Sequence, residues 1–287
     1  LKTLVKKELK AAAEEFGDER RSPLVARGEA AAFNEKDLLT AEPITVVLSD
    51  KGWIRGAKGH DIDPTTLSYK SGDKFLSAAC GRSNQNVFLQ DSVGRFYALG
   101  GHTLPSARGQ GEPATGRLNV ASGALFTDVI MGADDHKVLL GTDAGYGFIG
   151  KIGDLYTKNR AGKAVVSLPK GAKILSPKMV NDANALIAAV SNEGRLLVFP
   201  IAELPELARG KGNKIINIPG SRLQAREEFV IDYGVISEGD SLVVHSGKRY
   251  LVMKAKDLEH YSGERGRRGH KLPRGFQKVD KLEVEPK

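Results

Sequence analysis

From Pro43 onward, the apolar residues of the chain are grouped into short strand-like runs that come in pairs. Each pair flanks a turn with a glycine, which is typical of a β-hairpin. The pattern occurs five times, with turn glycines at Gly52, Gly94, Gly145, Gly194 and Gly247. The steps between these glycines are 42, 51, 49 and 53 residues. Such steps match one four-stranded propeller blade of roughly 40–50 residues.

Further apolar stretches between the hairpins supply additional candidate strands at residues 118–120, 164–168, 215–218 and 278–284. Helical patterns do not alternate with the strands, which disfavours a parallel α/β fold. We therefore predict an all-β, five-bladed, propeller-like disc of four-stranded blades over residues 43–285.

The amino end has a different pattern. Leu1, Leu4, Val5 and Leu9 have helical spacing, and Gly17 is placed to end the helix. Residues 1–17 are therefore predicted to be the end of a helix that begins upstream, in a chain that is a fragment of a longer protein. Residues 18–42 are more polar and are predicted to be a tether with short helical turns at 30–33 and 37–39.

Charge is distributed unevenly along the chain, whose 43 Lys and Arg against 35 Asp and Glu give a net charge of +8. Residues 1–42 hold 8 basic and 9 acidic groups, so the rest carries +9. Residues 151–175 have six basic groups to one acidic, and residues 241–274 have nine to three. These segments suggest an anionic partner, the alternative being a basic surface that serves solubility.

Each hairpin is followed by a stretch that combines glycine with arginine or lysine, at residues 55–59, 108–111, 160–163, 209–212 and 265–271. The leading arginine lies 3, 14, 15, 15 and 18 residues after the turn glycine. Glycine allows close backbone approach, while Arg and Lys bind phosphate. Loops at one position of successive blades would form a basic ribbon along the edge of the disc. Connections between blades with no binding role are the competing interpretation.

The predicted ligand of this ribbon is the backbone of double-stranded DNA. We find no recognition helix, zinc finger or aromatic stacking platform, so binding should tolerate any sequence and depend on DNA deformability. The candidate DNA-binding residues are Arg55, Lys58, Arg108, Lys158, Arg160, Lys163, Arg209, Lys211, Lys214, Arg265, Arg267, Arg268 and Lys271.

Catalytic and metal-binding motifs are not found in the sequence. It contains no P-loop, no nucleophile elbow and no dinucleotide fingerprint, and the six His residues lack ligand spacing. Cys80 follows two alanines and is predicted to be a small buried residue. The sequence lacks the apolar segments of a secretory signal or a membrane helix. We therefore predict no catalytic residue, metal site or cofactor in this chain.

The residues from Phe16 to Ser22, the tether, and Val46 to Ile54 with its Lys51-Gly52-Trp53 turn resemble one known junction. It joins the breakage–reunion core to the carboxy-terminal domain of bacterial type IIA topoisomerase A subunits. The basic loops and the period are similar to that domain's β-pinwheel, a propeller-like disc in which neighbouring blades exchange strands.

Two branches of this family compete. Gyrase A subunits carry a Gln-Arg-Arg-Gly-Gly-Lys-Gly box and usually six blades, whereas this chain has five hairpins and only the basic stretch 265–271. Both departures favour the topoisomerase IV branch over a gyrase-type DNA-wrapping domain. A propeller scaffold that binds an acidic protein is a further alternative.

The resemblance implies a non-catalytic domain that binds and bends duplex DNA for strand passage, in supercoil relaxation, decatenation and chromosome segregation. The active-site tyrosine lies upstream in such subunits, and ATP is hydrolysed with Mg²⁺ on the B subunit of an A2B2 enzyme. Some relatives also bind a condensin-like chromosome protein, for which Lys248, Arg249 and Arg274 are the candidate surface. A monomeric fragment is expected, in a cytoplasmic, nucleoid-associated enzyme, with peripheral inner-membrane association as an alternative.

Overall fold

The computed structural model describes residues 1–18, 22 and 40–287, in two units, Leu1–Asp37 and Leu38–Lys287. The first unit contains helix α1 (Lys2–Phe16), which ends where the amide of Gly17 donates to the Ala13 carbonyl at 3.0 Å. The helical turns predicted at residues 30–33 and 37–39 lie outside the described residues. None of the described helices combines the length and apolar character needed to cross a bilayer.

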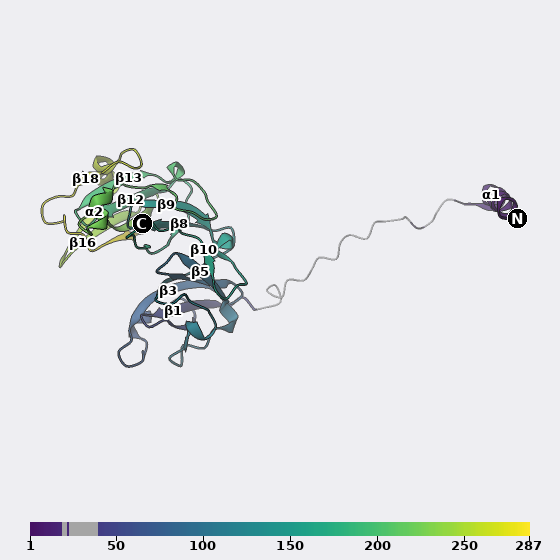
Figure 1. Ribbon diagram of the computed structural model, residues 1–287, viewed down its shortest axis with the longest axis horizontal. Helices are drawn as coiled ribbons and strands as arrows, with labels where there is room; N and C mark the ends of the chain where they lie inside the picture. Colours follow the sequence, from purple (N-terminus) through teal and green to yellow (C-terminus); the bar gives the residue numbers. More distant parts are fainter. Residues whose placement is uncertain (19–21, 23–39) are drawn as a thin grey trace. The chain divides into compact units, whose positions relative to one another are not determined.

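The second unit consists of successive antiparallel sheets, each of which is one blade (Figure 1). From inner to outer edge, the first blade contains β3 (Phe75–Arg82), β1 (Pro43–Ser49), β2 (Trp53–Lys58) and β6 (Glu112–Pro113). The second contains β7 (Phe126–Met131), β4 (Asn86–Asp91), β5 (Arg95–Gly100) and β10 (Lys163–Ala164). The third contains β11 (Lys178–Val180), β8 (Lys137–Thr142), β9 (Tyr146–Lys151) and β14 (Asn213–Lys214).

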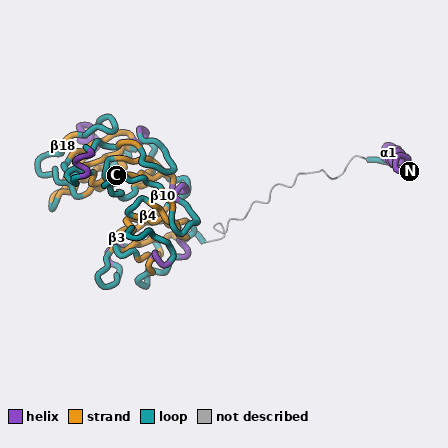
Figure 2. The backbone as a smooth tube through the Cα atoms, in the orientation of Figure 1, coloured by secondary structure: helices purple, strands orange, loops and turns teal. Residues whose placement is uncertain are grey.

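The fourth blade contains β15 (Val230–Ile236), β12 (Leu186–Ser191), β13 (Arg195–Pro200) and β18 (His270–Lys271). The fifth contains β19 (Lys281–Glu285), β16 (Ser241–Ser246) and β17 (Arg249–Met253). Short helical segments occupy the connections (Figure 2): η2 (Pro64–Thr66), η3 (Gly101–Thr103), η4 (Ala114–Gly116), η5 (Ile152–Leu155), η6 (Ile201–Glu203), α2 (Gly220–Gln224), α3 (Ala255–Leu258) and η7 (Glu259–Tyr261).

The inner strands of neighbouring blades pack together, as β3 does with β7 and β15 with β19. The blades follow one another along an arc, with the first (β1, β3) and the fifth (β16) at its ends (Figure 1). The predicted all-β, five-bladed pinwheel is confirmed.

Neighbouring blades are linked by strand exchange. The outer strand of each of the first four blades comes from the repeat that follows, as when β6 leaves the second repeat to pair with β2. The residue after the exchanged strand then donates to the carbonyl of the turn glycine: Ala114 to Gly52, and Ile215 to Gly145, at 2.9 and 2.7 Å. In the described part of the chain no strand pairs with the outer side of β17, so the fifth blade is three-stranded instead of four-stranded.

The hydrophobic cores lie between adjacent blades, which explains why central strands are buried on both faces. In β4, Val87 and Leu89 pack with the first blade, whereas Phe88 between them packs with the third. Side chains that alternate along a strand point to opposite faces, so one six-residue strand serves two cores.

Two of the four candidate strands between the hairpins are not strands, and the predicted burial of Cys80 is wrong. Residues 118–120 and 215–218 follow the outer strands and bury Leu118 and Ile215 against the blades, whereas 278–284 contains most of strand β19. The outer strands are two-residue segments, of which only β10 overlaps a predicted stretch, at Ala164. Cys80 is exposed, because it lies on the inner edge strand β3 and pairs with Thr45 on one side only.

Candidate nucleic-acid interface

Four of the five predicted basic stretches are crossing loops, meaning the loops that lead into the exchanged outer strands. Residues 108–111, 160–162, 209–212 and 265–269 directly precede β6, β10, β14 and β18. The four loops therefore occupy one structural position on successive blades, at the outer edge.

The last glycine of each crossing loop is required by packing against the neighbouring strand. Gly212 has a φ of +73°, and a Cβ there would lie 2.1 Å from the Gly147 carbonyl oxygen. Gly162 has a φ of +68°, and a Cβ there would lie 2.7 Å from the Tyr97 ring. These glycines let the loop lie flat on the hairpin, which explains their recurrence without any ligand.

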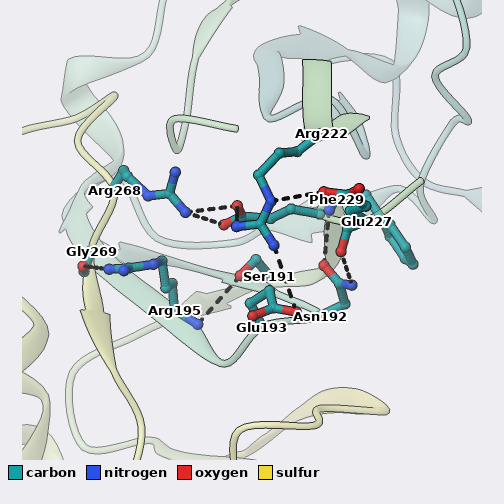
Figure 3. Close-up of polar contacts among 10 residues, drawn as sticks. Ser191, Asn192, Glu193, Arg195, Arg222, Glu227, Phe229, Arg268 and Gly269 are labelled. Atoms are coloured by element: carbon teal, nitrogen blue, oxygen red, sulfur yellow. Dashed lines mark hydrogen bonds and ion pairs between the residues drawn. The ribbon is translucent and has the colours of Figure 1, made fainter. Parts of the chain in front are cut away.

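In the second, third and fourth hairpins, the side chain that follows the turn glycine supports a crossing loop. Nε and Nη2 of Arg95 donate to the carbonyls of Ala161 and Gly162, both at 3.0 Å. The Tyr146 ring lies 4.3 Å from the Lys211 ammonium. Arg195 donates to the Gly269 carbonyl at 3.4 Å (Figure 3).

Backbone hydrogen bonds join the loops in series. Asn119 donates to the Arg160 carbonyl at 2.8 Å, and Ser167 to the Gly210 carbonyl at 2.9 Å. Asn217 donates to the Arg267 carbonyl at 3.0 Å. We call residues 106–120, 158–167, 207–217 and 262–274 the rim belt. Because each segment is bonded to the next, the belt presents its cations on one continuous backbone.

Six of the predicted DNA-binding residues are exposed on this belt, and none of them forms an ion pair with another described residue. They are Arg108, Lys158, Arg160, Arg209, Lys211 and Lys271. Arg267 is also exposed, and its pair with Glu264 at 2.8 Å leaves both side chains more than 70% exposed. A salt bridge of that kind is weak enough for another anion to replace. Lys248, Arg249 and Arg274 are exposed on the fifth blade.

The first predicted loop, residues 55–59, is not a loop, because its first four residues continue strand β2. Arg55 is only 2% exposed, and its Nη1 donates to the carbonyls of Ser68 and Gly109 at 2.9 Å. Its guanidinium thus holds the Arg108 loop from inside and is not available to a phosphate. Lys58 is exposed and pairs with Glu42 at 3.2 Å.

Four further predicted residues are half-buried and bind protein groups. Lys163 donates to the Asp154 carbonyl, Lys214 to Asn217 Oδ1, and Arg265 to the Lys214 carbonyl. Arg268 binds both carboxylate oxygens of Glu228 at 2.6 and 2.7 Å. These cations hold the belt together, so their charge is partly neutralised or directed inward.

Glu228 is fully buried and also accepts from Arg222 at 2.7 Å. Arg222 and Arg268, from segments 46 residues apart, point toward one another in Figure 3. Their shared bond to Glu228 joins the fourth crossing loop to the segment that enters the fourth blade. Neither Arg222 nor Glu228 was predicted from the sequence, since no local pattern marks a buried ion pair between distant segments.

The second loop rests on a buried tyrosine. The Tyr97 hydroxyl donates to Asp91 Oδ2 at 2.9 Å. Burial, together with the hydrogen bond to Asp91 and the charge of Asp91, raises the pKa of Tyr97 to about 12.

The described residues contain no group of three or more His, Cys, Asp or Glu that could hold a metal ion.

Comparisons with known proteins agree with this architecture. The family model for the DNA gyrase C-terminal domain, a β-propeller, matches residues 136–181 and 186–232. The A subunit of DNA topoisomerase 4 from Pseudomonas aeruginosa is 56% identical over 99% of this chain, and that from Escherichia coli K12 is 48% identical over 99%. The chain spans 38% of the length of each of these two relatives.

A solved structure of the E. coli ParC C-terminal domain is also similar. It is 46% identical, with a TM-score of 0.78, and the match covers 86% of this chain and 100% of that one.

Proposed function

The chain belongs to the family of C-terminal domains of DNA topoisomerase IV A subunits, and on that premise we propose that its rim belt binds and bends double-stranded DNA. A gyrase-type wrapping domain is the alternative, and it is disfavoured because the relatives that match 99% of this chain are topoisomerase IV A subunits.

The observation that carries the proposal is the series of exposed, unpaired cations at one structural position of successive blades. Bending a 20–30 bp duplex by 40–90° costs on the order of 1–6 kcal/mol, so several phosphate contacts must compensate for it. The six exposed cations, from Arg108 to Lys271, come from successive blades, which follow one another along an arc (Figure 1). They offer no base-reading element, so binding would depend on the DNA backbone.

Substitutions in the third crossing loop test this proposal. Arg209→Ala with Lys211→Ala removes two exposed cations without a buried bond, and we expect affinity for all duplex sequences to fall by about tenfold or more at 0.15 M salt. Lys6→Ala with Lys7→Ala, on the exposed helix α1, makes the same charge change in the other unit and should have little effect. Equal affinity of both double variants would contradict a role for the belt.

In the whole protein we propose that this domain positions duplex segments for ATP-dependent strand passage, in supercoil relaxation, decatenation and chromosome segregation. The active-site tyrosine would lie upstream, and the B subunit of an A2B2 enzyme would bind ATP and Mg²⁺, so the domain itself would need no cofactor. Such an enzyme would act on the nucleoid in the cytoplasm. A full-length chain with the two loop substitutions, assembled with its B partner into the holoenzyme, should keep ATPase activity and lose decatenation rate.

A second function, protein binding, is favoured by the fifth blade. Its edge strand β17 lacks the outer strand that covers each of the other four blades in the described chain. Lys248, Arg249 and Arg274 are exposed around it, as are Tyr250 at 67% and Val252 at 42%. We propose this edge for an acidic, condensin-like protein; binding that survives nuclease treatment and is lost in Tyr250→Glu would support it.

A further inference from the structure

We propose that a recess between residues 116–118, which follow strand β6, and the second crossing loop is a binding site for one DNA phosphodiester and its sugar. The inference rests on the proposed DNA-binding function and identifies where on the belt the backbone is fixed. The recess has a volume of about 310 Å³ and lies over the outer half of the second blade. Its basic lining comes from Arg117, Lys158 and Arg160, and no acidic side chain lines it.

An extra helical turn creates this recess. Soon after strand β10, Ser167 donates a backbone hydrogen bond to the third crossing loop, and soon after β14, Asn217 donates one to the fourth. After β6 the chain first makes the 3₁₀ turn η4, and only then does Asn119 donate to the Arg160 carbonyl. The added turn separates residues 116–118 from the second crossing loop, which leaves a space between them.

One wall of the recess and the backbone of the other are fixed before any ligand binds. Nη1 and Nη2 of Arg117 donate to the hydroxyl and the carbonyl of Thr103, both at 2.8 Å, and its Nε pairs with Glu112 at 2.6 Å, so Arg117 shapes the wall and its charge is partly neutralised. In the second loop, Asn159 Oδ1 accepts from the Ala161 amide at 2.9 Å, which fixes the backbone turn from which the exposed, unpaired Lys158 and Arg160 extend to meet the phosphate. Groups that are already oriented lose less entropy on binding.

The lining fits a nucleic-acid backbone better than a free anion. Beside the cations, the recess is lined by Ala98, Leu99 and Leu118, which bind no anion but would pack against the apolar face of a deoxyribose. Its volume is about ten times the roughly 30 Å³ that one water occupies in the liquid, more than a phosphate alone needs. Phosphate oxygens beside a sugar are the repeating chemistry of DNA.

A bulky, uncharged side chain placed in the recess tests whether the recess binds the DNA backbone. Gly116 lines the recess, a Cβ there would meet nothing within 4 Å, and its φ lies outside the left-handed range. Gly116→Phe should fill the space and leave every cation in place. Gly220 lies in the helical turn α2 that follows β14, as Gly116 lies in η4 after β6, and a Cβ there would also meet nothing within 4 Å. Gly220→Phe is therefore the matched control.

The assay is fluorescence anisotropy of a 30-bp duplex with the 287-residue chain across a salt series. We expect Gly116→Phe to lower affinity about fivefold at 0.15 M salt and to reduce the salt slope by about one, the effect of one lost phosphate contact. Gly220→Phe should match the wild type. Wild-type affinity and slope in Gly116→Phe, with the Arg209→Ala/Lys211→Ala variant still impaired, would overturn the binding site in the recess and leave the proposed function intact.

A titration with inorganic phosphate distinguishes a DNA phosphodiester from a free phosphate ion as the ligand of the recess. Titrated at constant ionic strength, it should perturb the amide NMR signals of Gly116 and Asn159 only at millimolar concentrations. Micromolar binding of phosphate, together with unchanged duplex affinity in Gly116→Phe, would assign the recess to a free anion and overturn the DNA assignment. If neither Gly116→Phe nor the loop variant changed duplex binding, the proposed function itself would fail.

Discussion

Replacing Glu228 by Gln should destabilise the domain strongly while leaving its exposed DNA-binding cations in place. Glu228 is fully buried and accepts charge-assisted hydrogen bonds from Arg222 and Arg268. Removing one partner of a buried ion pair typically costs about 3–5 kcal/mol of unfolding free energy. Since both arginines are about one-third exposed, at 36% and 32%, water can replace part of the loss. We therefore expect about 3 kcal/mol.

Arg268→Ala separates stability from binding. Glu228 retains Arg222 in that variant, so the expected loss of unfolding free energy is smaller, about 1–2 kcal/mol. Arg268 is bound to a buried carboxylate, so DNA affinity should stay within about twofold, whereas Arg209→Ala should lower it about fivefold at 0.15 M salt and leave stability unchanged.

Urea unfolding followed by circular dichroism measures the first quantity, and duplex anisotropy at a temperature where every variant is folded measures the second. Two results would refute the reasoning. A loss below about 1 kcal/mol in Glu228→Gln would mean that the pair does not hold the loop. Equal loss of DNA affinity in Arg268→Ala and Arg209→Ala would mean that Arg268 leaves Glu228 to bind phosphate.

Two further predictions concern the support of the loops. Gly212→Ala should lower the unfolding free energy by at least about 2 kcal/mol and remove hydrogen-exchange protection at β14, because the added Cβ would clash with the Gly147 carbonyl. In the control Gly171→Ala the residue has a φ of +78° but open space around it, so the unfolding free energy should fall by only about 1 kcal/mol. Tyr97 has a folded-state pKa raised from 10.0 to about 12, so its contribution to stability is complete below pH 10 and is lost as the pH rises toward 12. Tyr97→Phe should therefore show a smaller fall in urea midpoint between pH 9 and pH 11; equal falls would show that another group titrates.

The blades were predictable because a hairpin is a local structure. Gly94 and Gly145 adopt the positive φ of +84° and +78° that their turns require, and apolar residues on both sides form the central strands. The spacing of the turn glycines therefore predicted both the all-β fold class and the number of blades.

The outer strands could not be predicted in the same way. They are two residues long, and they pair with the preceding blade, as Glu112 does with Ile54. Such pairing depends on where the whole repeat lies, and two residues contain no periodicity to detect. The inner strands β3 and β7 were missed because each pairs with the first strand of its hairpin across a long connection instead of a tight turn.

The loops were located by composition, but the role of each cation was decided by burial. Arg55 and Arg108 both stand beside glycine in the sequence, yet Arg55 is buried under the loop that exposes Arg108. The partner of Arg268 lies 40 residues away, so its ion pair exists only in the folded chain. The arginine-glycine pattern therefore marked a crossing loop in four of the five stretches, while contacts in the fold decide which arginine is free.

The most direct test of the rim belt is the salt dependence of duplex binding by this chain. Each phosphate neutralised contributes about 0.9 to the slope of log affinity against log salt, so six exposed cations predict a slope of about −5. The slope should be the same for duplexes of unrelated sequence and should approach about −3.5 in Arg209→Ala/Lys211→Ala. A slope near about −1, or one that varies with sequence while the double variant leaves it unchanged, would contradict DNA binding by the belt.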